Sequence, residues 1–165
     1  MIKVGILTVS DSCARGERED ESYKALREVL EAEGYEVAAY EVVPDEPAQI
    51  RRFLRQWADQ LGLHLVLTTG GTGLAPRDHT PEATLEVVDK EAPGIAELVR
   101  AEGLKQTPHA ALSRGRAGVR GRTLIVNLPG SPKGAASSLK AILPVLPHAV
   151  EIITGERLEG GLDHE

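Results

Sequence analysis

Short apolar runs alternate with amphipathic stretches along this chain, and this alternation constrains the fold more than any other feature. Runs rich in branched apolar residues predict strands at 2–9, 35–43, 63–68 and 123–127. Apolar residues at helical spacing occupy the intervals between these runs. Strands that alternate with helices predict right-handed crossovers and an α/β fold, with a mostly parallel sheet covered by helices on both faces.

The helices are predicted at 21–33, from the turn at 44–47 to Gly62, from Thr80 onward, at 95–102 and at about 135–143. The second of these carries an apolar stripe made of Ile50, Phe53, Leu54, Trp57 and Leu61. Residues 10–20 are expected to form a polar loop, and Pro93-Gly94 to break the chain. The segment 103–122 has no clear periodicity and admits a hairpin or an irregular excursion.

A length of 165 residues suits one domain, expected over 1–155 with a flexible C-terminal tail at 156–165. The net charge of −6, with no basic block and few aromatic residues, argues against a nucleic-acid partner. The single cysteine, Cys13, allows no intrachain disulfide and no cysteine-based zinc site. No signal peptide and no apolar run of roughly 18 residues is recognised, so we expect a cytoplasmic protein without a membrane segment.

In a parallel sheet, ligands bind beyond the carboxyl ends of the strands. The predicted strands therefore direct attention to the loops that follow Val9, Val43, Thr68 and Asn127. The third loop contains Thr69, Gly70, Gly71, Thr72 and Gly73, in which glycine backbone amides can form an anion nest. It matches neither the P-loop nor the dinucleotide fingerprint, and a tight turn that needs positive φ angles is the alternative.

The residues after this glycine loop strengthen the interpretation as a phosphate site. Arg77, Asp78, His79 and Thr80 lie just before a predicted helix, whose N-terminus favours anions. Asp78 could hold a magnesium ion that bridges phosphates. The alternative for Asp78 and Thr80 is ordinary helix capping.

The loop after Asn127 is a second candidate cradle. Its candidate phosphate-binding residues are Pro129, Gly130, Ser131 and Lys133. Backbone amides, a hydroxyl and one ammonium suit a second phosphate or a ribose. The alternative is a rigid strand-to-helix turn with a solvated lysine.

The two remaining loops supply Ser10 and Asp11 after the first strand and Asp45 after the second. If the sheet is parallel, all four loops open at one edge, and Asp45 and Asp78 can converge on a phosphate cradle. Two carboxylates near two anion nests indicate metal-assisted phosphoryl or nucleotidyl transfer. Cys13 has no histidine paired with it in the sequence, and the five histidines lack the spacing of metal ligands.

Several of these segments resemble one known family. Thr-Thr-Gly-Gly-Thr-Gly at 68–73, Pro-Arg-Asp-His-Thr-Pro-Glu-Ala-Thr at 76–84 and Asn-Leu-Pro-Gly-Ser-Pro-Lys-Gly at 127–134 look like signatures of the molybdenum-cofactor biosynthesis proteins of the MogA/MoaB type. Thr-Val-Ser-Asp at 8–11 and Val-Pro-Asp-Glu at 43–46 match in position. The resemblance extends from about Ile2 to Gly155, but the segment 103–122 is not matched feature by feature.

The resemblance implies a three-layer α/β/α domain that adenylylates molybdopterin with ATP and Mg²⁺ and releases pyrophosphate. The family's two functional aspartates map onto Asp45 and Asp78, and the glycine and Pro-Gly loops would cradle the two substrates. It also implies a homotrimer, with a hexamer as the alternative, and a downstream molybdenum insertase as a partner. Two other functions stay open: a non-catalytic molybdopterin carrier or scaffold that uses the same pocket, and a metal-dependent pyrophosphatase.

Overall fold

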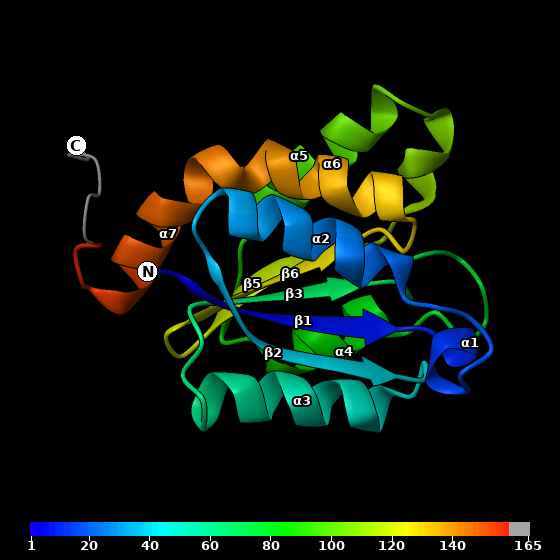
Figure 1. The fold of residues 1–165 in the computed structure, drawn as a ribbon, viewed down its shortest axis with the longest axis horizontal. Helices are drawn as coiled ribbons and strands as arrows, with labels where there is room; N and C mark the ends of the chain where they lie inside the picture. Colours follow the sequence, from blue (N-terminus) through cyan, green and yellow to red (C-terminus); the bar gives the residue numbers. More distant parts are fainter. Residues whose placement is uncertain (159–165) are drawn as a thin grey trace.

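The computed structural model describes residues 1–158, which form a six-stranded sheet of order β2-β1-β3-β6-β5-β4 between two layers of helices (Figure 1). The strands are β1 (Lys3–Val9), β2 (Glu36–Val43), β3 (Leu65–Thr69), β4 (Lys90–Glu91), β5 (Ala117–Arg120) and β6 (Thr123–Leu128). The four strands predicted from sequence pair in parallel, and β5 and β4 are added antiparallel at one edge. The predicted α/β class and three-layer arrangement are confirmed.

The helices are α1 (Asp11–Ala14), α2 (Glu21–Ala32), α3 (Pro47–Asp59), α4 (Thr80–Val87), α5 (Pro93–Leu104), α6 (Pro132–Ile142) and α7 (Leu146–Thr154), with 3-10 turns η1 (Pro108–Leu112) and η2 (Leu143–Val145). Helices α2, α5, α6 and α7 cover one face of the sheet, and α3 and α4 cover the other (Figure 1). The two faces are packed independently because side chains alternate along each strand. In β1, for example, Ile6 packs under α2 and α6 while Leu7 packs on α3, and both are fully buried.

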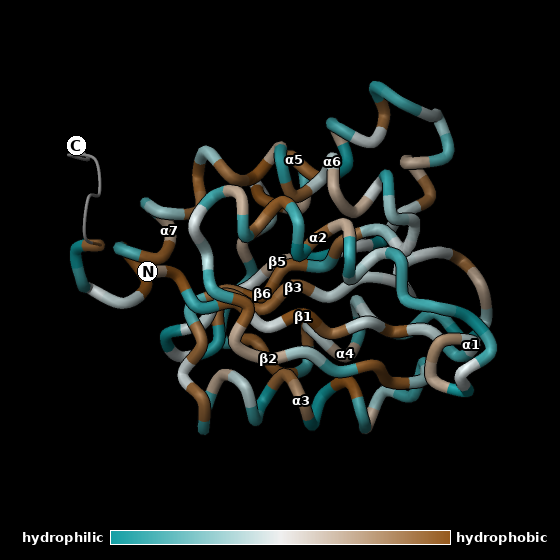
Figure 2. Tube along the Cα trace, viewed as in Figure 1, coloured by the Kyte–Doolittle hydropathy of each residue, from teal (hydrophilic) through white to brown (hydrophobic). Residues whose placement is uncertain are grey.

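Hydropathy follows this layering: apolar residues gather on the sheet and on the inward sides of the helices (Figure 2). In α3 the inward residues are Ile50, Leu54 and Trp57, as predicted. Leu61, which the sequence analysis assigned to the same stripe, lies beyond the end of α3 and is 53% exposed. The stripe ends early because the helix ends at Asp59, one turn before the glycine predicted to stop it.

The segment 103–122, which resisted prediction, contains η1 and β5. Strand β5 forms a hairpin with β6 through Gly121, whose φ of +57° suits a tight turn. Strand β5 is only four residues long, so it carried too few alternations to stand out in the sequence.

Three further boundaries differ from prediction. The 10–20 loop contains the short helix α1, which begins after the Ser10 cap. Pro93 begins α5 and does not break the chain, and α6 begins at Pro132, three residues before the predicted 135. Proline is tolerated in the first turn of a helix, where its missing N–H would have no intrahelical acceptor.

The C-terminal part of the chain also departs from expectation. Of the tail predicted at 156–165, residues 159–165 lie outside the described residues, and Leu158 packs against the core with its N–H donating to Glu151. The continuous helical segment Pro132–Thr154 is long and apolar enough to cross a membrane by length and composition, which the sequence analysis did not recognise. In the fold its residues Leu139, Ile142 and Val150 are buried against the sheet, as in a core helix.

Gly5 provides a test of the packing on the α3 face. A Cβ at this position would lie 2.6 Å from Trp57 Cε3 and 2.8 Å from Leu63 Cδ1. We expect Gly5→Ala to lower the free energy of unfolding by about 1–3 kcal/mol, because the core must shift to admit it. The measurement is urea denaturation, with Gly94→Ala as the matched control.

Gly94 lies in the first turn of α5, has nothing within 4 Å of an added Cβ, and should tolerate alanine without loss of stability. Equal stability of the Gly5→Ala variant and the parent would contradict the close packing against Trp57.

Candidate functional site

The carboxyl ends of β1, β2, β3 and β6 bring four loops to one edge of the sheet. Backbone hydrogen bonds join neighbouring loops there: Ser10 N donates to Val43 O at 2.9 Å, and Gly70 N donates to Leu128 O at 3.2 Å. The loops predicted to be chemically important therefore do lie side by side.

Asp45 is the most buried acidic side chain of this edge, with 6% of its surface exposed. Its Oδ1 accepts a hydrogen bond from His79 N at 3.2 Å, and its own N–H donates to Asp11 Oδ1 at 3.0 Å. Its Oδ2 faces Gly71, where an added Cβ would lie 2.8 Å away. Burial raises the pKa of Asp45, and the negative charges of Asp78 and Asp11 contribute to the same shift.

Asp78 reaches the same region from the other side of the glycine loop. Its Oδ2 accepts from Ala75 N at 3.0 Å, and an added Cβ at Gly73 would lie 2.9 Å from it. Each of the two carboxylates thus lies so close to a glycine that a side chain there would overlap one of its oxygens. The structure brings Asp45, Asp78 and the glycine loop together within one chain.

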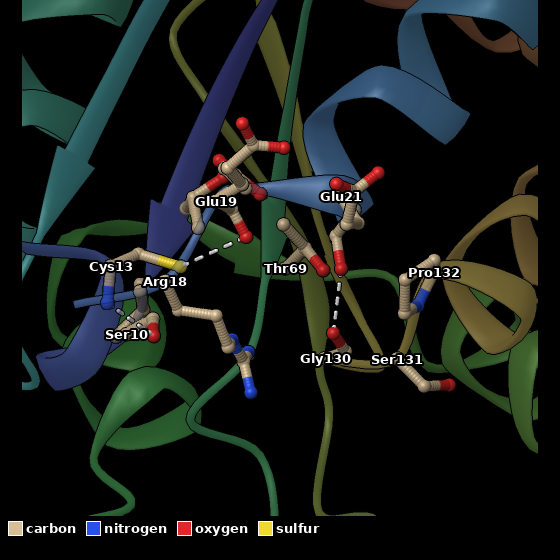
Figure 3. Close-up of a pocket in the computed structure, with 14 residues that line it drawn as sticks. Ser10, Cys13, Arg18, Glu19, Glu21, Thr69, Gly130, Ser131 and Pro132 are labelled. Atoms are coloured by element: carbon tan, nitrogen blue, oxygen red, sulfur yellow. Dashed lines mark hydrogen bonds between the residues drawn. The ribbon is translucent and has the colours of Figure 1, made fainter. Parts of the chain in front are cut away.

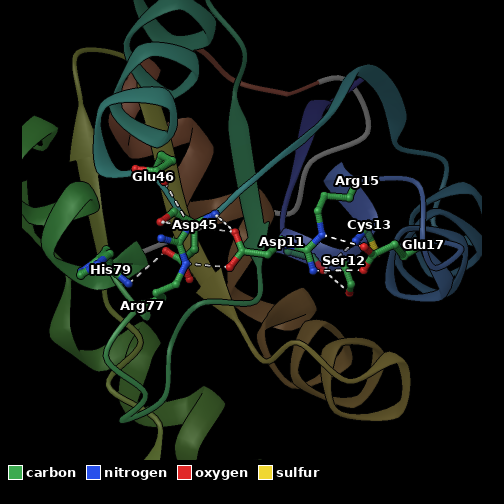
Figure 4. A network of polar contacts seen from close by, with 10 residues as sticks. Asp11, Ser12, Cys13, Arg15, Glu17, Asp45, Glu46, Arg77 and His79 are labelled. Atoms are coloured by element: carbon green, nitrogen blue, oxygen red, sulfur yellow. Dashed lines mark hydrogen bonds and ion pairs between the residues drawn. The ribbon is translucent and has the colours of Figure 1, made fainter.

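Arg77 ties three of the loops to one another (Figure 4). Its Nε donates to Asp11 Oδ2 at 2.8 Å and its Nη2 to Asp11 Oδ1 at 3.0 Å, a bidentate pair. Its Nη2 also donates to Glu46 Oε1 at 3.1 Å. Because Asp11 accepts from the backbone of Asp45 as well, Arg77 holds Asp45 in place through Asp11.

The glycine turn 70–71 has a conformation that other residues rarely adopt. Gly70 has φ +100° and Gly71 has φ +68°, and a Cβ at either would overlap a neighbouring oxygen, of Val9 or of Thr80 respectively. The turn-forming role that the sequence analysis kept as an alternative is therefore real. It does not exclude anion binding, because the same conformation is what exposes successive backbone amides.

Two of the predicted phosphate-binding hydroxyls are already engaged within the chain. Thr69 Oγ1 donates to Pro129 O at 2.6 Å, and Thr80 Oγ1 donates to Gly70 O at 3.0 Å. The prediction that Thr80 caps α4 is wrong: His79 occupies the cap position, and Thr80 is the first helical residue. Both threonines shape the loops from buried positions, and Thr72 is buried as well.

The Pro-Gly loop is fixed from both ends. Ser131 caps α6, its Oγ accepting from Gly134 N at 3.1 Å, and Ser22 Oγ donates to Gly130 O at 2.6 Å. Pro129 is partly buried and Lys133 is exposed. The loop is therefore rigid, and it presents Lys133 at the N-terminus of α6.

Two cavities open on opposite sides of the Pro-Gly loop, and Ser131 lines both. The α2 cavity, of about 580 Å³, is lined by Ser10, Arg18, Thr69, Gly70 and Gly130 among others (Figure 3). The α5 cavity, of about 470 Å³, is lined by Thr72, Gly73, Arg100, Ser113 and Lys133 among others. Each has the size of a site for one small molecule, and the glycine loop runs from one to the other.

Comparison with known proteins assigns the family. Residues 5–148 match the family model described as a probable molybdopterin binding domain. The chain belongs to the molybdopterin-binding domain family.

Relatives of known name agree with this assignment. The chain is 44% identical to the molybdopterin adenylyltransferase of Helicobacter pylori strain 26695, over 96% of this chain and 91% of that protein. It is 45% identical to the molybdenum cofactor synthesis protein cinnamon of Drosophila melanogaster, covering 92% of this chain but only 26% of cinnamon. The crystal structure of MoaB from Thermus thermophilus superposes with a TM-score of 0.91 at 65% identity, covering 96% of this chain and all of that one.

The sequence analysis of this molybdopterin-binding domain missed Arg114. Its backbone N donates to Thr72 O at 2.8 Å, its Nε to Gly73 O at 2.8 Å and its Nη2 to Asp78 O at 2.9 Å. Arg114 thus fixes the glycine loop and Asp78 from the connection between η1 and β5, and Glu82 pairs with its Nη1. No signal in the sequence could place it, because it lies in the segment 103–122.

The ion pair between Arg77 and Asp11 makes the stability of the fold depend on pH. The bidentate hydrogen bonds from Arg77, followed by the hydrogen bond from Asp45 N, lower the pKa of Asp11 to about 2. A carboxyl group whose pKa is lower in the folded state stabilises the fold above its unfolded pKa, and this contribution is lost as the pH falls through the folded pKa. The loss from Asp11 should therefore occur between about pH 4 and about pH 2.

We expect Arg77→Gln to raise the pKa of Asp11 toward its ordinary value, as measured by carboxyl-carbon NMR titration. Arg27→Gln, which removes an exposed ion pair with Glu31 on α2, is the control and should leave the pKa of Asp11 unchanged. An Asp11 pKa that stays near 2 in Arg77→Gln would show that other groups hold the carboxylate.

Proposed function

We propose that this chain is a molybdopterin adenylyltransferase, which joins the adenylyl group of ATP to the terminal phosphate of molybdopterin and releases pyrophosphate. The observation that carries the proposal is the meeting of Asp45 and Asp78 at the 70–73 glycine loop, whose residues line two cavities of substrate size. Relatives named molybdopterin adenylyltransferase, which align over nearly the whole chain, support it.

In this reaction, an oxygen of the molybdopterin phosphate forms a bond to the α-phosphorus of ATP. The bond from that phosphorus to the bridging oxygen of the β-phosphate breaks, and its electron pair leaves with pyrophosphate. The attacking phosphate is already an anion, so the site requires no strong general base. Alignment of the two substrates and neutralisation of their charge then supply most of the catalysis.

Residues of this chain divide these tasks. We assign the two cavities to the two substrates, one each, so that their phosphates meet at the glycine loop. We assign the Lys133 ammonium, which lines the α5 cavity, and the backbone amides of Gly71 and Gly73 to offset phosphate charge. Ser10 is fixed as the cap of α1 and Asp11 by Arg77, so both support the loop that borders the α2 cavity.

Asp45 and Asp78 are the residues that would hold Mg²⁺. No cluster of three or more His, Cys, Asp or Glu side chains that could bind a metal occurs within residues 1–158. Two carboxylates completed by substrate phosphates and water are, however, a usual Mg²⁺ environment, and Gly71 and Gly73 let the loop backbone pass close to an oxygen of each aspartate. When bound, Mg²⁺ would neutralise phosphate charge and polarise the reacting phosphorus.

The direct test is incubation with molybdopterin, ATP and Mg²⁺, followed by mass detection of the adenylylated pterin. Asp78→Asn should lower turnover about 100-fold, because it removes a charge that acts on the transition state, and should leave molybdopterin binding largely intact. The control is Asp59→Asn, whose carboxylate pairs with Arg120 on the far side of the sheet and should not affect turnover.

Two outcomes would redirect the proposal. Binding of molybdopterin with no adenylylated product under any condition would favour the carrier or scaffold. Steady release of pyrophosphate from ATP alone would favour a pyrophosphatase that uses water as the nucleophile. Unchanged turnover in Asp78→Asn would remove that residue from the reaction.

The assembly that we propose is a cytoplasmic homotrimer, with a hexamer as the alternative and a molybdenum insertase as the downstream partner. Exposed apolar side chains, including Leu74, Leu98, Leu104 and Leu112, offer surface for contacts between subunits. Sedimentation equilibrium should give a mass about three times that of the 17.7 kDa chain. A species of one chain over the micromolar range would contradict the trimer.

A further inference from the structure

We propose that the Thr8 hydroxyl hydrogen-bonds the nitrogen heterocycle of the substrate that enters the α2 cavity. This inference rests on the proposed function, since it takes the ligand to be one of the two substrates of adenylyl transfer. Both ATP and molybdopterin carry a planar nitrogen heterocycle with hydrogen-bonding groups along its edge, so the chemistry is common to them.

The proposal starts from the hydroxyl groups on the floor of the α2 cavity. Three buried hydroxyl residues line it, Thr8, Ser22 and Thr69. Ser22 and Thr69 each donate at 2.6 Å to a carbonyl of the Pro-Gly loop. Thr8 is 4% exposed, and its Oγ1 has no hydrogen-bond partner among residues 1–158.

An unpartnered buried hydroxyl lowers stability, and packing does not require one at this position. Thr8 lies on β1 on the same face as Val4 and Ile6, where valine would fill the same volume and leave no polar group unsatisfied. Thr8 lines the α2 cavity, so a ligand bound there is the group that can satisfy its hydroxyl. Thr8 lies in the middle of the sheet, where it pairs with Val42 on one side and Thr69 on the other. Its hydroxyl is therefore held rigidly.

The charges around the α2 cavity favour a neutral ring over a phosphate on this floor. Thr8, Val9, Ser22 and Thr69, the buried lining residues, carry no charge. Arg18, labelled in Figure 3, is the one Lys or Arg among the described lining residues, and it is exposed. Glu19, Asp20 and Glu21 also border the cavity, and their carboxylates disfavour an anion placed deep inside.

The orientation of the ligand follows from the position of Thr8 beside Thr69, the residue that precedes the glycine turn. Thr8 lies on the floor and Gly70 at the start of the glycine turn, which leads to Gly71 and Asp45. A substrate whose ring reaches Thr8 can therefore extend its phosphate along the turn toward the carboxylates. Thr8 is in this sense a substrate-binding residue that sets the depth and orientation of the ring.

The test compares Thr8→Val with Thr8→Ser, which keeps the hydroxyl. Dissociation constants for ATP alone and for molybdopterin alone are measured by calorimetry on each variant, together with the Tm of the substrate-free protein. We expect Thr8→Val to weaken one of the two substrates by about fivefold to tenfold, the loss of one hydrogen bond, with an unchanged or higher Tm. Thr8→Ser should bind that substrate within about twofold of the parent.

Thr123→Val is the matched control. Thr123 is equally buried in the sheet, but it lies at the opposite end of β6, and its hydroxyl donates to Leu63 O. We expect this variant to lose stability and to keep both dissociation constants. The substrate that Thr8→Val weakens identifies whether the adenine or the pterin ring occupies the α2 cavity.

Unchanged affinity for both substrates in Thr8→Val would overturn the proposal, and so would equal weakening of both with a lower Tm, which indicates a distorted site. Failure of the proposed function is a separate result. If the parent protein binds neither ATP nor molybdopterin and forms no product, both proposals fall. If the parent makes the product and Thr8→Val binds both substrates normally, only the role of Thr8 is lost.

Discussion

The Asp11 carboxylate is the point on which the geometry of the site depends. One oxygen accepts from the backbone of Asp45, and both accept from Arg77, so a single side chain joins the loops after β1, β2 and β3. Parallel pairing of the strands brings these loops to one edge but does not fix their side chains relative to one another. Asp11 and Arg77 do so with charge-assisted hydrogen bonds, which are stronger than neutral ones.

Glycines in the loop after β3 are the second feature on which the site depends. Gly71 stands against Asp45 and Gly73 against Asp78, and in both cases an added Cβ would fill the space beside a carboxylate oxygen. Gly70 is required for a different reason, because it passes too close to the Val9 carbonyl for any side chain. The glycine loop therefore turns the chain and lets its backbone pass close to two acidic side chains.

Much of this arrangement could be read from the sequence. The strands 2–9 and 123–127 are continuous apolar runs, so their place in a buried parallel sheet followed, and with it the edge where Asp45 and Asp78 meet. Arg114 could not be placed, because it lies in a segment without periodicity. The residues that it contacts, Gly73 and Asp78, are more than 35 positions away in the sequence. The hydrogen bonds of the Thr69 and Thr80 hydroxyls could not be predicted either, since their acceptors are backbone carbonyls that only the fold brings near.

The hydroxyl groups of the site have two distinct roles: most of them fix the loops, and we propose that Thr8 binds the substrate. Thr69, Thr80 and Ser22 donate to carbonyls of Pro129, Gly70 and Gly130, so they fix the loops before any substrate arrives. A rigid loop loses little conformational entropy on binding, so more of the interaction energy remains as affinity. The Thr8 hydroxyl has no such acceptor among residues 1–158, and Thr8 lines the cavity from a central strand. In a site otherwise so completely hydrogen-bonded, its unsatisfied hydroxyl is better explained by recognition of a ligand than by support of the fold.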